Sequence, residues 1–292
     1  MFGKSFTLGA VIAAASFSMA TMVSAQDLPA KSDAVAALLP AQIRDAGVLR
    51  IAVPDIGKPL AYKEGDTLKG MDYDLARAVA SVMGLKSEIN LIPFTAALSG
   101  LQSNKFDISF GEFYVTKARL EVADFVTGWQ DYSSFLVLKA KDYKPTALPE
   151  ICGRTVGAMA GSAELEILNK AAGNCSGNTP TISAFPSISN AVLALNSNRV
   201  DGVLINRGGA QESINLDAGL AASGEIGGGP TATAVARNGN SAELLAALKA
   251  AYDHLIATGS YAAILERNDT SYGAIKEAVI YTADSVPPDY SF

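Results

Sequence analysis

The chain has 292 residues, with 23 Lys and Arg against 29 Asp and Glu, so its formal net charge is −6. An acidic surface disfavours nucleic acid and anionic membranes as partners, and we expect neither. The length exceeds what a single small core needs and suits two lobes, while the ordinary hydrophobic content argues against a disordered chain.

The first 25 residues have the features of a secretory signal peptide. Lys4 is the only charge before Asp27, residues 8–23 are apolar and small, and Val23-Ser24-Ala25 is a small-x-small cleavage site. We therefore predict a signal peptide at 1–25 and a periplasmic mature protein. Residues 26–41 are expected to form a short mature leader without strand character.

Strand and helix patterns alternate over the first half of the mature chain. Strands are expected at residues 49–53, 89–93, 106–110 and 134–139. Between them we expect a helix capped by Asp72 that ends before Gly84, and a second helix capped by Thr95. This alternation predicts an α/β lobe with a mostly parallel sheet.

The same alternation restarts after Pro145. Strands are expected at residues 155–159, 181–184, 200–205 and 231–237. Ser162 and Ser187 are each expected to cap a helix, and a long amphipathic helix carries Leu245 and Leu248. A second α/β lobe therefore follows, and the periodicity allows it to be inserted into the first lobe or placed after it.

The strand at 106–110 leads into a loop that carries Thr116 and a single Arg119. A guanidinium at a strand end, with a hydroxyl and backbone N–H groups beside it, suits bidentate capture of a carboxylate. The local sequence also allows Arg119 to form a surface ion pair with Glu121 or Asp124.

Cys152 and Cys175 are the only two cysteines. In an exported protein an isolated pair predicts a disulfide, and two buried free thiols are the alternative. In the chain-entropy description a disulfide that closes a loop of this length stabilises the fold by about 3 kcal/mol. Two cysteines alone lack the further ligands of a metal site, so no metal is expected.

Catalytic patterns are sparse. His254 is the only histidine and lies beside the apolar stripe of the late helix, so Ser-His-Asp, Cys-His and histidine-based metal sites are poorly supported. There is no Walker loop and no GxGxxG motif that opens a helix. We therefore expect no cofactor and no enzyme activity.

Seven short motifs occur in a fixed order between residues 49 and 265. They include Gly70-Met-Asp-Tyr-Asp74, Thr116-x-x-Arg119 and Gly161-Ser-Ala-Glu164, with the others at 101–108, 148–157, 198–202 and 255–264. With this series the chain resembles the family 3 extracellular solute-binding proteins, the periplasmic amino-acid receptors of ABC importers.

The resemblance implies a two-lobe periplasmic-binding-protein fold of type II in the α/β class. Lobe 1 would comprise residues 42–139 and 232–284, and lobe 2 would comprise residues 140–231. Two crossing segments, near 139–144 and 229–234, would form a hinge, and the cleft between the lobes would hold the ligand.

The resemblance also implies the ligand-binding residues. Arg119 would bind a ligand carboxylate beside Thr116, and Phe94 would pack on the ligand or belong to the core. The remaining positions of the cleft would be Glu112, Tyr114, Gly161, Ser162 and Ala163. The last three open a helix whose free N–H groups and dipole favour a carboxylate, and Ser162 is also an ordinary N-cap.

Three positions depart from the family pattern. Asn206 stands where the family has an Asp that accepts from the ligand α-ammonium, so a charge-assisted contact is lost there. Gly57 stands where an aromatic residue is common. Glu112 replaces a small residue, and it would replace the missing charge, meet a cationic side chain, turn to solvent or pair with Lys117.

We expect a monomeric periplasmic receptor that captures a small carboxylate-bearing solute, an amino acid or a derivative. Its further partners would be the membrane subunits of an ABC permease. One alternative is a cyclohexadienyl (prephenate or arogenate) dehydratase on the same fold, with Glu112 as the acid. Another is a receptor for a non-amino-acid carboxylate, which Asn206 would suit.

Overall fold

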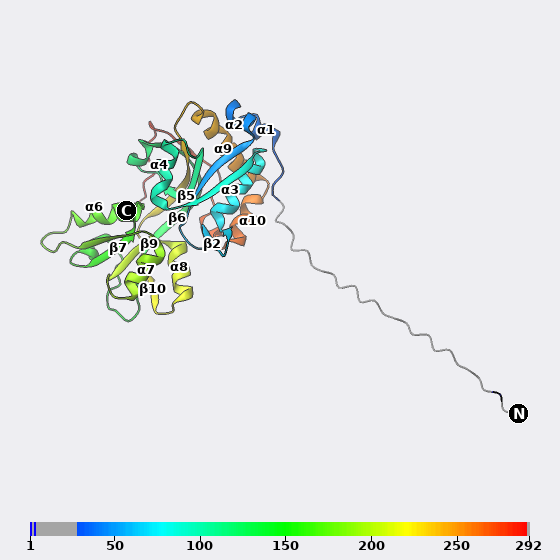
Figure 1. Cartoon of the computed structure of the whole chain (residues 1–292). Helices are drawn as coiled ribbons and strands as arrows, with labels where there is room; N and C mark the ends of the chain where they lie inside the picture. The colour runs from blue at the N-terminus through cyan, green and yellow to red at the C-terminus, as the bar shows by residue number, and fades with distance from the viewer. Residues whose placement is uncertain (2, 4–27, 291–292) are drawn as a thin grey trace.

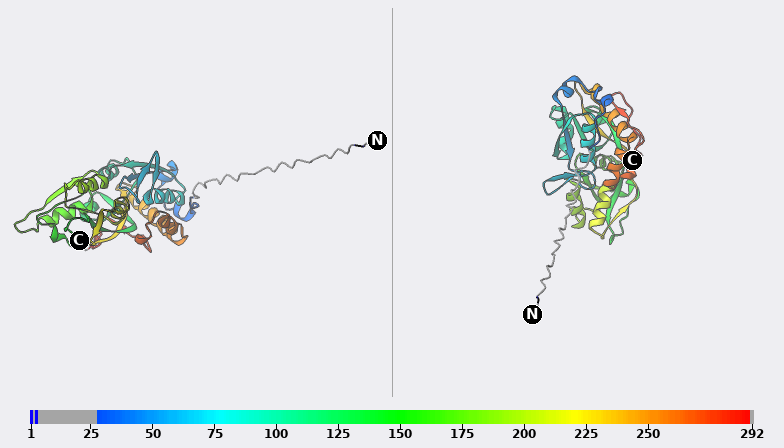
Figure 2. Two further views of the ribbon diagram at one scale, coloured as in Figure 1. Left: turned by 90° about the horizontal axis from the view of Figure 1, so that it is seen from below. Right: turned by 90° about the vertical axis from the view of Figure 1, so that its right-hand side faces the viewer.

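The computed structural model describes residues 1, 3 and 28–290, which form two α/β lobes (Figure 1). Figure 2 shows the elongated outline that results from the two lobes lying end to end. The predicted signal peptide at 1–25 lies outside the described residues, apart from Met1 and Gly3. Among the residues that are described, no helix is both long and apolar enough to cross a membrane.

The first lobe is built on a mixed sheet with five longer strands. These are β1 (Val48–Pro54), β4 (Lys86–Ile92), β5 (Ile108–Tyr114), β11 (Gly228–Ala236) and the first part of β6 (Ala123–Leu138), and the two-residue strand β12 (Ile280–Tyr281) also pairs with β6. Strand β1 is parallel to β4 and β5, whereas β11 is antiparallel to β5 and β6. Successive side chains of β1 point to opposite faces, so Ile51 and Val53 enter one hydrophobic cluster and Ala52 enters another.

Helices cover both faces of this sheet. The helices α3 (Met71–Val82), α9 (Ser241–Ala257) and α10 (Ser260–Arg267) bury their apolar sides in the cluster of Ile51, while α4 (Ala97–Gln102) packs on the opposite face. Val35 and Leu39, from the predicted leader, are buried in the same cluster as Ile51. The described part of the leader is therefore packed on the first lobe, where it forms α1 (Asp33–Ala36).

The second lobe repeats this arrangement on a smaller scale. Strand β7 (Thr155–Met159) is parallel to β8 (Thr181–Phe185) on one side and to β9 (Gly202–Asn206) on the other. The helices α6 (Ala163–Ala172), α7 (Ile188–Asn196) and α8 (Arg207–Leu216) pack around this sheet. The predicted disulfide is confirmed, since Cys152 and Cys175 are bonded to each other.

Strand β6 runs through both lobes and connects their sheets. It pairs with β11 up to Tyr132, and from Ser133 onward it pairs with β9 and with β10 (Leu220–Ser223). The strand order is therefore β4-β1-β5-β11-β6-β9-β7-β8. The pairing changes partner before residue 133, earlier than the 139–144 segment expected for the first crossing, and the returning strand already pairs at Gly228.

Polar residues within β6 explain why the hydrophobicity pattern did not predict most of this strand. Only 134–139 was expected, whereas the strand starts at Ala123 and includes the buried residues Asp124, Thr127 and Asp131. Asp124 is tolerated there because it forms an ion pair with Arg237, with 2.6 Å between Oδ1 and Nη2.

Two of the predicted helix caps are wrong and two are right. Helix α3 begins after Gly70, whose φ of +111° few other residues adopt, and the carboxyl group of Asp72 is buried inside the lobe. Thr95 lies within the short 3₁₀ helix η1 (Phe94–Ala96), which directly precedes α4, and Ala96 is the N-cap of α4. Ser162 and Ser187 do cap α6 and α7, because each hydroxyl accepts from the N–H group three residues later.

The other elements are short. They are α2 (Ala41–Ala46), β2 (Tyr62–Glu64), β3 (Thr67–Lys69), α5 (Lys117–Leu120), η2 (Leu148–Ile151), η3 (Ser271–Gly273) and β12 (Ile280–Tyr281). After β12 the chain returns to the junction of the lobes, where the backbone N–H group of Gly228 donates to the carbonyl oxygen of Tyr290 at 2.9 Å.

Candidate functional site

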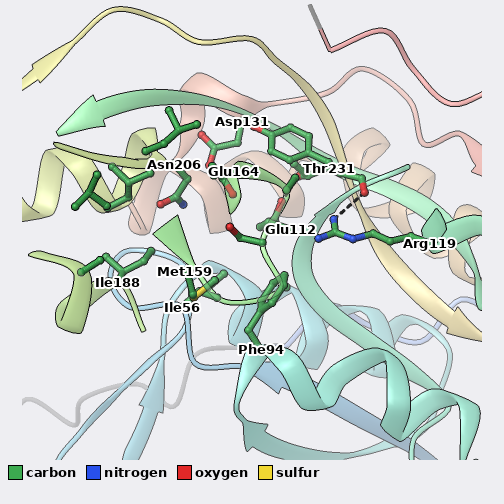
Figure 3. A pocket seen from close by; sticks show the side chains of 18 residues that line it. Ile56, Phe94, Glu112, Arg119, Asp131, Met159, Glu164, Ile188, Asn206 and Thr231 are labelled. Carbon is green, nitrogen blue, oxygen red and sulfur yellow. Dashed lines mark hydrogen bonds between the residues drawn. The ribbon is translucent and has the colours of Figure 1, made fainter. Parts of the chain in front are cut away.

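A pocket lies between the two lobes and is lined by residues of both. The first lobe and the crossing strands contribute Ile56, Phe94, Gly111, Glu112, Tyr114, Arg119, Asp131 and Thr231. The second lobe contributes Met159, Ser162, Ala163, Glu164, Ile188, Ala191, Val203, Leu204, Ile205 and Asn206. Figure 3 shows Arg119 on one side of this pocket, Asp131, Glu164 and Asn206 on the other, and Glu112 between them.

Arg119 is positioned by the turn that follows β5. Its backbone N–H group donates to the Thr116 hydroxyl at 3.3 Å, because Thr116 caps the single turn of α5. Its side chain is only 8% exposed, and the guanidinium carbon lies 5.4 Å from the ring centre of Phe113 and 5.9 Å from that of Phe94. The guanidinium therefore lies beside two aromatic rings and faces the pocket (Figure 3).

The guanidinium of Arg119 already connects the lobes. Nη1 donates to the carbonyl oxygen of Tyr114 in the first lobe at 2.8 Å, and Nη2 donates to that of Gly161 in the second at 3.1 Å. Burial lowers the pKa of Arg119, and the Glu164 carboxylate opposes this effect. A guanidinium has five N–H groups, so donors remain for a ligand carboxylate. The surface ion pair considered from the sequence is not formed, since Asp124 pairs with Arg237 instead.

Asp131, on β6, is the most deeply buried acid that lines the pocket, with 2% exposure. Its Oδ1 accepts from the backbone N–H group of Tyr132 at 2.9 Å and from the Tyr272 hydroxyl at 3.5 Å. Its Oδ2 is also buried and has no hydrogen-bond donor in the part of the chain that the structure describes. Burial raises the pKa of Asp131 well above its usual value, and the neighbouring carboxyl groups of Glu112 and Glu164 raise it further.

Glu164 contributes a second carboxyl group from the first turn of α6. It accepts a hydrogen bond from the Ser133 hydroxyl at 2.9 Å and is 8% exposed. A carboxylate in the first turn of a helix is stabilised by the helix dipole. The N-terminal end of α6, which faces the pocket, therefore already has the carboxylate of Glu164 beside it.

Glu112 contributes the third carboxyl group and stands in an unusual backbone conformation, with φ of +51°. It accepts a hydrogen bond from the Thr231 hydroxyl on β11. Behind it, inside the first lobe, lies Asp72, which is fully buried. Burial and the adjacent Asp72 raise the pKa of Glu112 well above its usual value, so this pair of acids retains a proton.

Asn206 lies at the end of β9 and faces the pocket from the second lobe (Figure 3). Its side chain does not cap the helix that follows, and its buried Oδ1 has no donor among the described residues. The Asn206 side chain favours the ionised form of Asp131, which acts against the pKa increase caused by burial.

The structure brings together seven of the nine residues expected to bind ligand, namely Phe94, Glu112, Tyr114, Arg119, Ser162, Ala163 and Asn206. The other two support the site without lining it, since Thr116 caps α5 and Gly161 supplies a carbonyl oxygen to Arg119. Their roles in ligand binding stay predictions.

Asp131, Glu164 and Thr231 also line the pocket but were not predicted from the sequence, because isolated polar residues form no recognisable motif. Trp129 points away, and its Nε1 donates to the carbonyl oxygen of Thr270.

Two curated relatives are named as arginine-binding proteins. The arginine-binding protein ArgT of Corynebacterium glutamicum is 26% identical over 289 residues, which cover 92% of this chain and 93% of ArgT. The arginine-binding extracellular protein ArtP of Bacillus subtilis is 32% identical over 109 residues, 37% of this chain and 42% of ArtP. The match thus spans less than half the length of ArtP.

Solved structures show the same fold. An ancestral arginine-binding protein bound to arginine superposes with a TM-score of 0.71 at 28% identity, over 76% of this chain and 98% of that one. Residues 49–268 match the family described as "Bacterial extracellular solute-binding proteins, family 3". That match covers most of the chain, and the protein belongs to this family of solute-binding proteins.

Proposed function

We propose that the protein is a periplasmic receptor that binds an amino acid between its lobes and delivers it to the membrane subunits of an ABC importer. The observation that carries this proposal is Arg119, a buried guanidinium that faces the pocket and is held by one carbonyl oxygen from each lobe. Carbonyl oxygens orient a guanidinium without neutralising it, and Glu164 favours its charged form without forming an ion pair with it, so a ligand carboxylate would supply the directly paired counter-charge.

Arginine is the first ligand to test. Two relatives carry arginine in their names, and the acids of the pocket outnumber its cationic side chains. In this proposal the receptor acts as a monomer, after removal of residues 1–25, and performs no reaction on its ligand.

The test is a ligand panel measured by calorimetry, with amino acids, their decarboxylated amines and simple dicarboxylates. We expect binding only of compounds with a carboxylate, and Arg119→Ala should lower the affinity more than 100-fold. Arg119→Lys should also bind weakly, because an ammonium lacks the planar fork. Arg154→Ala, an exposed arginine over the ring of Tyr143, is the matched control. Unchanged amino-acid affinity in the folded Arg119 variants would refute the proposal.

One observation favours a second candidate, a dehydratase of the cyclohexadienyl type. A carboxyl group in a pocket whose pKa is raised by burial, such as that of Glu112, is suited to donate a proton. Incubation with prephenate would produce phenylpyruvate if this candidate were correct, and the ultraviolet absorbance of phenylpyruvate would report it. Glu112→Gln should abolish such a signal. If the wild type forms no product, the dehydratase candidate is excluded and the receptor proposal stands.

A further inference from the structure

The charges that line the pocket do not balance. Arg119 is the only cationic side chain among the described lining residues, whereas Glu112, Asp131 and Glu164 are acids. Glu112 shares a proton with Asp72, and Glu164 is held by the Ser133 hydroxyl and is the acid that most favours the charged form of Arg119. Asp131 has no cationic partner among the described residues, because the groups that contact its carboxyl group there are neutral: Tyr132, Tyr272 and Asn206.

Asp131 lines the pocket, and one of its carboxyl oxygens has no hydrogen-bond donor among the described residues. In the sheet, Asp131 pairs with Gly229 of β11. Oδ1 is held by Tyr132 and Tyr272, while Oδ2 is buried with no donor among the described residues. Burying a carboxylate oxygen without a donor costs free energy that a cation from outside the protein would recover.

We propose that Asp131 binds the ammonium group of the ligand through Oδ2, and that the ligand class is therefore one with both a carboxylate and an ammonium. The inference rests on the proposed function, because Arg119 must hold the carboxylate. It explains why a neutral Asn206 is compatible with an amino-acid ligand. Asn206 lies on the same side of the pocket as Asp131, so the negative charge has moved from β9 to the crossing strand β6 (Figure 3).

The location also makes Asp131 sensitive to the lobe arrangement. It lies two residues before Ser133, where β6 exchanges its first-lobe partner for second-lobe partners. An ammonium held here and a carboxylate held at Arg119 would both be bound at the junction of the lobes. Such a ligand favours the conformation in which both groups are reached at once.

The experiment compares ligands that differ only in the ammonium group. The probes are L-arginine and δ-guanidinovalerate, which is arginine without its α-ammonium group. If another amino acid binds more tightly in the panel, that amino acid and its desamino form are used as well. Asp131→Asn keeps the shape of the side chain and an oxygen for Tyr132 and Tyr272, so the variant removes the charge alone.

We expect Asp131→Asn to bind the amino acid about 10- to 100-fold more weakly and the desamino compound about as well as the wild type does. The double variant Asp131→Asn with Asn206→Asp should recover part of the lost affinity, because the charge returns to the same side of the pocket. Asp124→Asn is the matched control, since it changes a buried acid on the same strand that pairs with Arg237 outside the pocket.

Two results would overturn the inference. One is an unchanged amino-acid affinity in Asp131→Asn, and the other is an equal loss for both probes, which would indicate a structural role. Failure of the proposed function looks different, because the wild-type protein would then bind no amino acid at all or would bind it without Arg119.

Discussion

Glu112 and Asp72 place two carboxyl groups side by side in the first lobe, and no cationic side chain of the described residues pairs with either. Glu112 lines the pocket and is held by the Thr231 hydroxyl, while Asp72 lies behind it in the second position of α3. Burial raises the pKa of Asp72 to about 6, although its contacts with Glu112 and the Gly111 backbone act in the opposite direction. Two adjacent acids of this kind hold one proton between them near neutral pH.

This pair predicts that stability falls as pH rises. A group whose pKa is higher in the folded than in the unfolded state contributes stability below its unfolded pKa, and loses it as pH rises through the folded value. For Asp72 the window runs from 3.8 to about 6. We expect Asp72→Asn to flatten the decrease of the free energy of unfolding between these values, as measured by urea denaturation.

The control for that measurement is Asp66→Asn, in the exposed turn between β2 and β3, which should leave the slope as it is in the wild type. If Asp72→Asn has the same pH dependence as the wild type, deprotonation of Asp72 is not the cause of the decrease in the free energy of unfolding.

The residues that sequence reasoning identified are those whose chemistry is local. Arg119 was found because a strand end, Thr116 and the guanidinium lie within a few positions of one another. Asp131 and Glu164 were not, because their role depends on burial by segments far away, such as Tyr272 and Ser133. The spacing of residues along the sequence does not predict such long-range contacts.

At the scale of elements, the same distinction explains which strands and caps were predicted. Strand β7 has a continuous apolar run and was predicted at its observed bounds, 155–159. Strand β6 was recognised only in its last third, because a long strand shared by two sheets does not alternate simply. Asp72 was taken for a cap because Asp favours that position, whereas Gly70 supplies the backbone geometry and burial in the lobe determines where the carboxyl group goes.

The segment after β12 is an element that the family pattern did not predict. Tyr290 connects the end of β5 to β11. Its hydroxyl accepts from the Val115 N–H group at 2.7 Å and donates to the Pro230 carbonyl oxygen at 2.9 Å. Its ring lies 4.7 Å from the ring of Tyr114, whose carbonyl oxygen holds Arg119, and it clusters with Ala163 of α6. The C-terminal segment thus supports the pocket from behind.

We expect Tyr290→Phe to lower the free energy of unfolding by about 1–3 kcal/mol, because the buried Val115 N–H group loses its acceptor. Chemical denaturation of the ligand-free protein measures this change. Tyr73→Phe, on the partly exposed side of α3, is the control and should change stability by less than about 0.5 kcal/mol. A Tyr290→Phe variant as stable as the control would mean that the hydroxyl is dispensable.

At the scale of the whole molecule, the lobes touch each other on a second side of the pocket. The guanidinium carbon of Arg207, in α8, lies 4.5 Å from the ring centre of Tyr272 in the first lobe. Lys58 Nζ and Glu212 Oε1 are 4.0 Å apart across the same boundary. Tyr272 also donates to Asp131, so a contact between the lobes continues directly into the pocket.

Gly208 allows this close approach and provides a test of it. A methyl group there would lie 2.9 Å from Cδ of Pro59 and 3.2 Å from the Tyr272 hydroxyl, both in the first lobe. Gly208 is in α8, where alanine is the better helix former by about 1 kcal/mol. Gly208→Ala should therefore leave the free energy of unfolding unchanged or higher, while it keeps the lobes from reaching the arrangement described above.

If ligand binding requires that arrangement, the affinity of Gly208→Ala should fall roughly 10-fold, because part of the binding free energy is spent on a less populated conformation. Calorimetry gives the affinity, and urea denaturation of the same ligand-free samples gives the stability. Gly239→Ala, where a methyl group meets open space, is the control and should match the wild type in affinity. Wild-type affinity in Gly208→Ala would mean that the ligand is held with the lobes farther apart, and that Arg119 and Asp131 reach it without the contact between α8 and Tyr272.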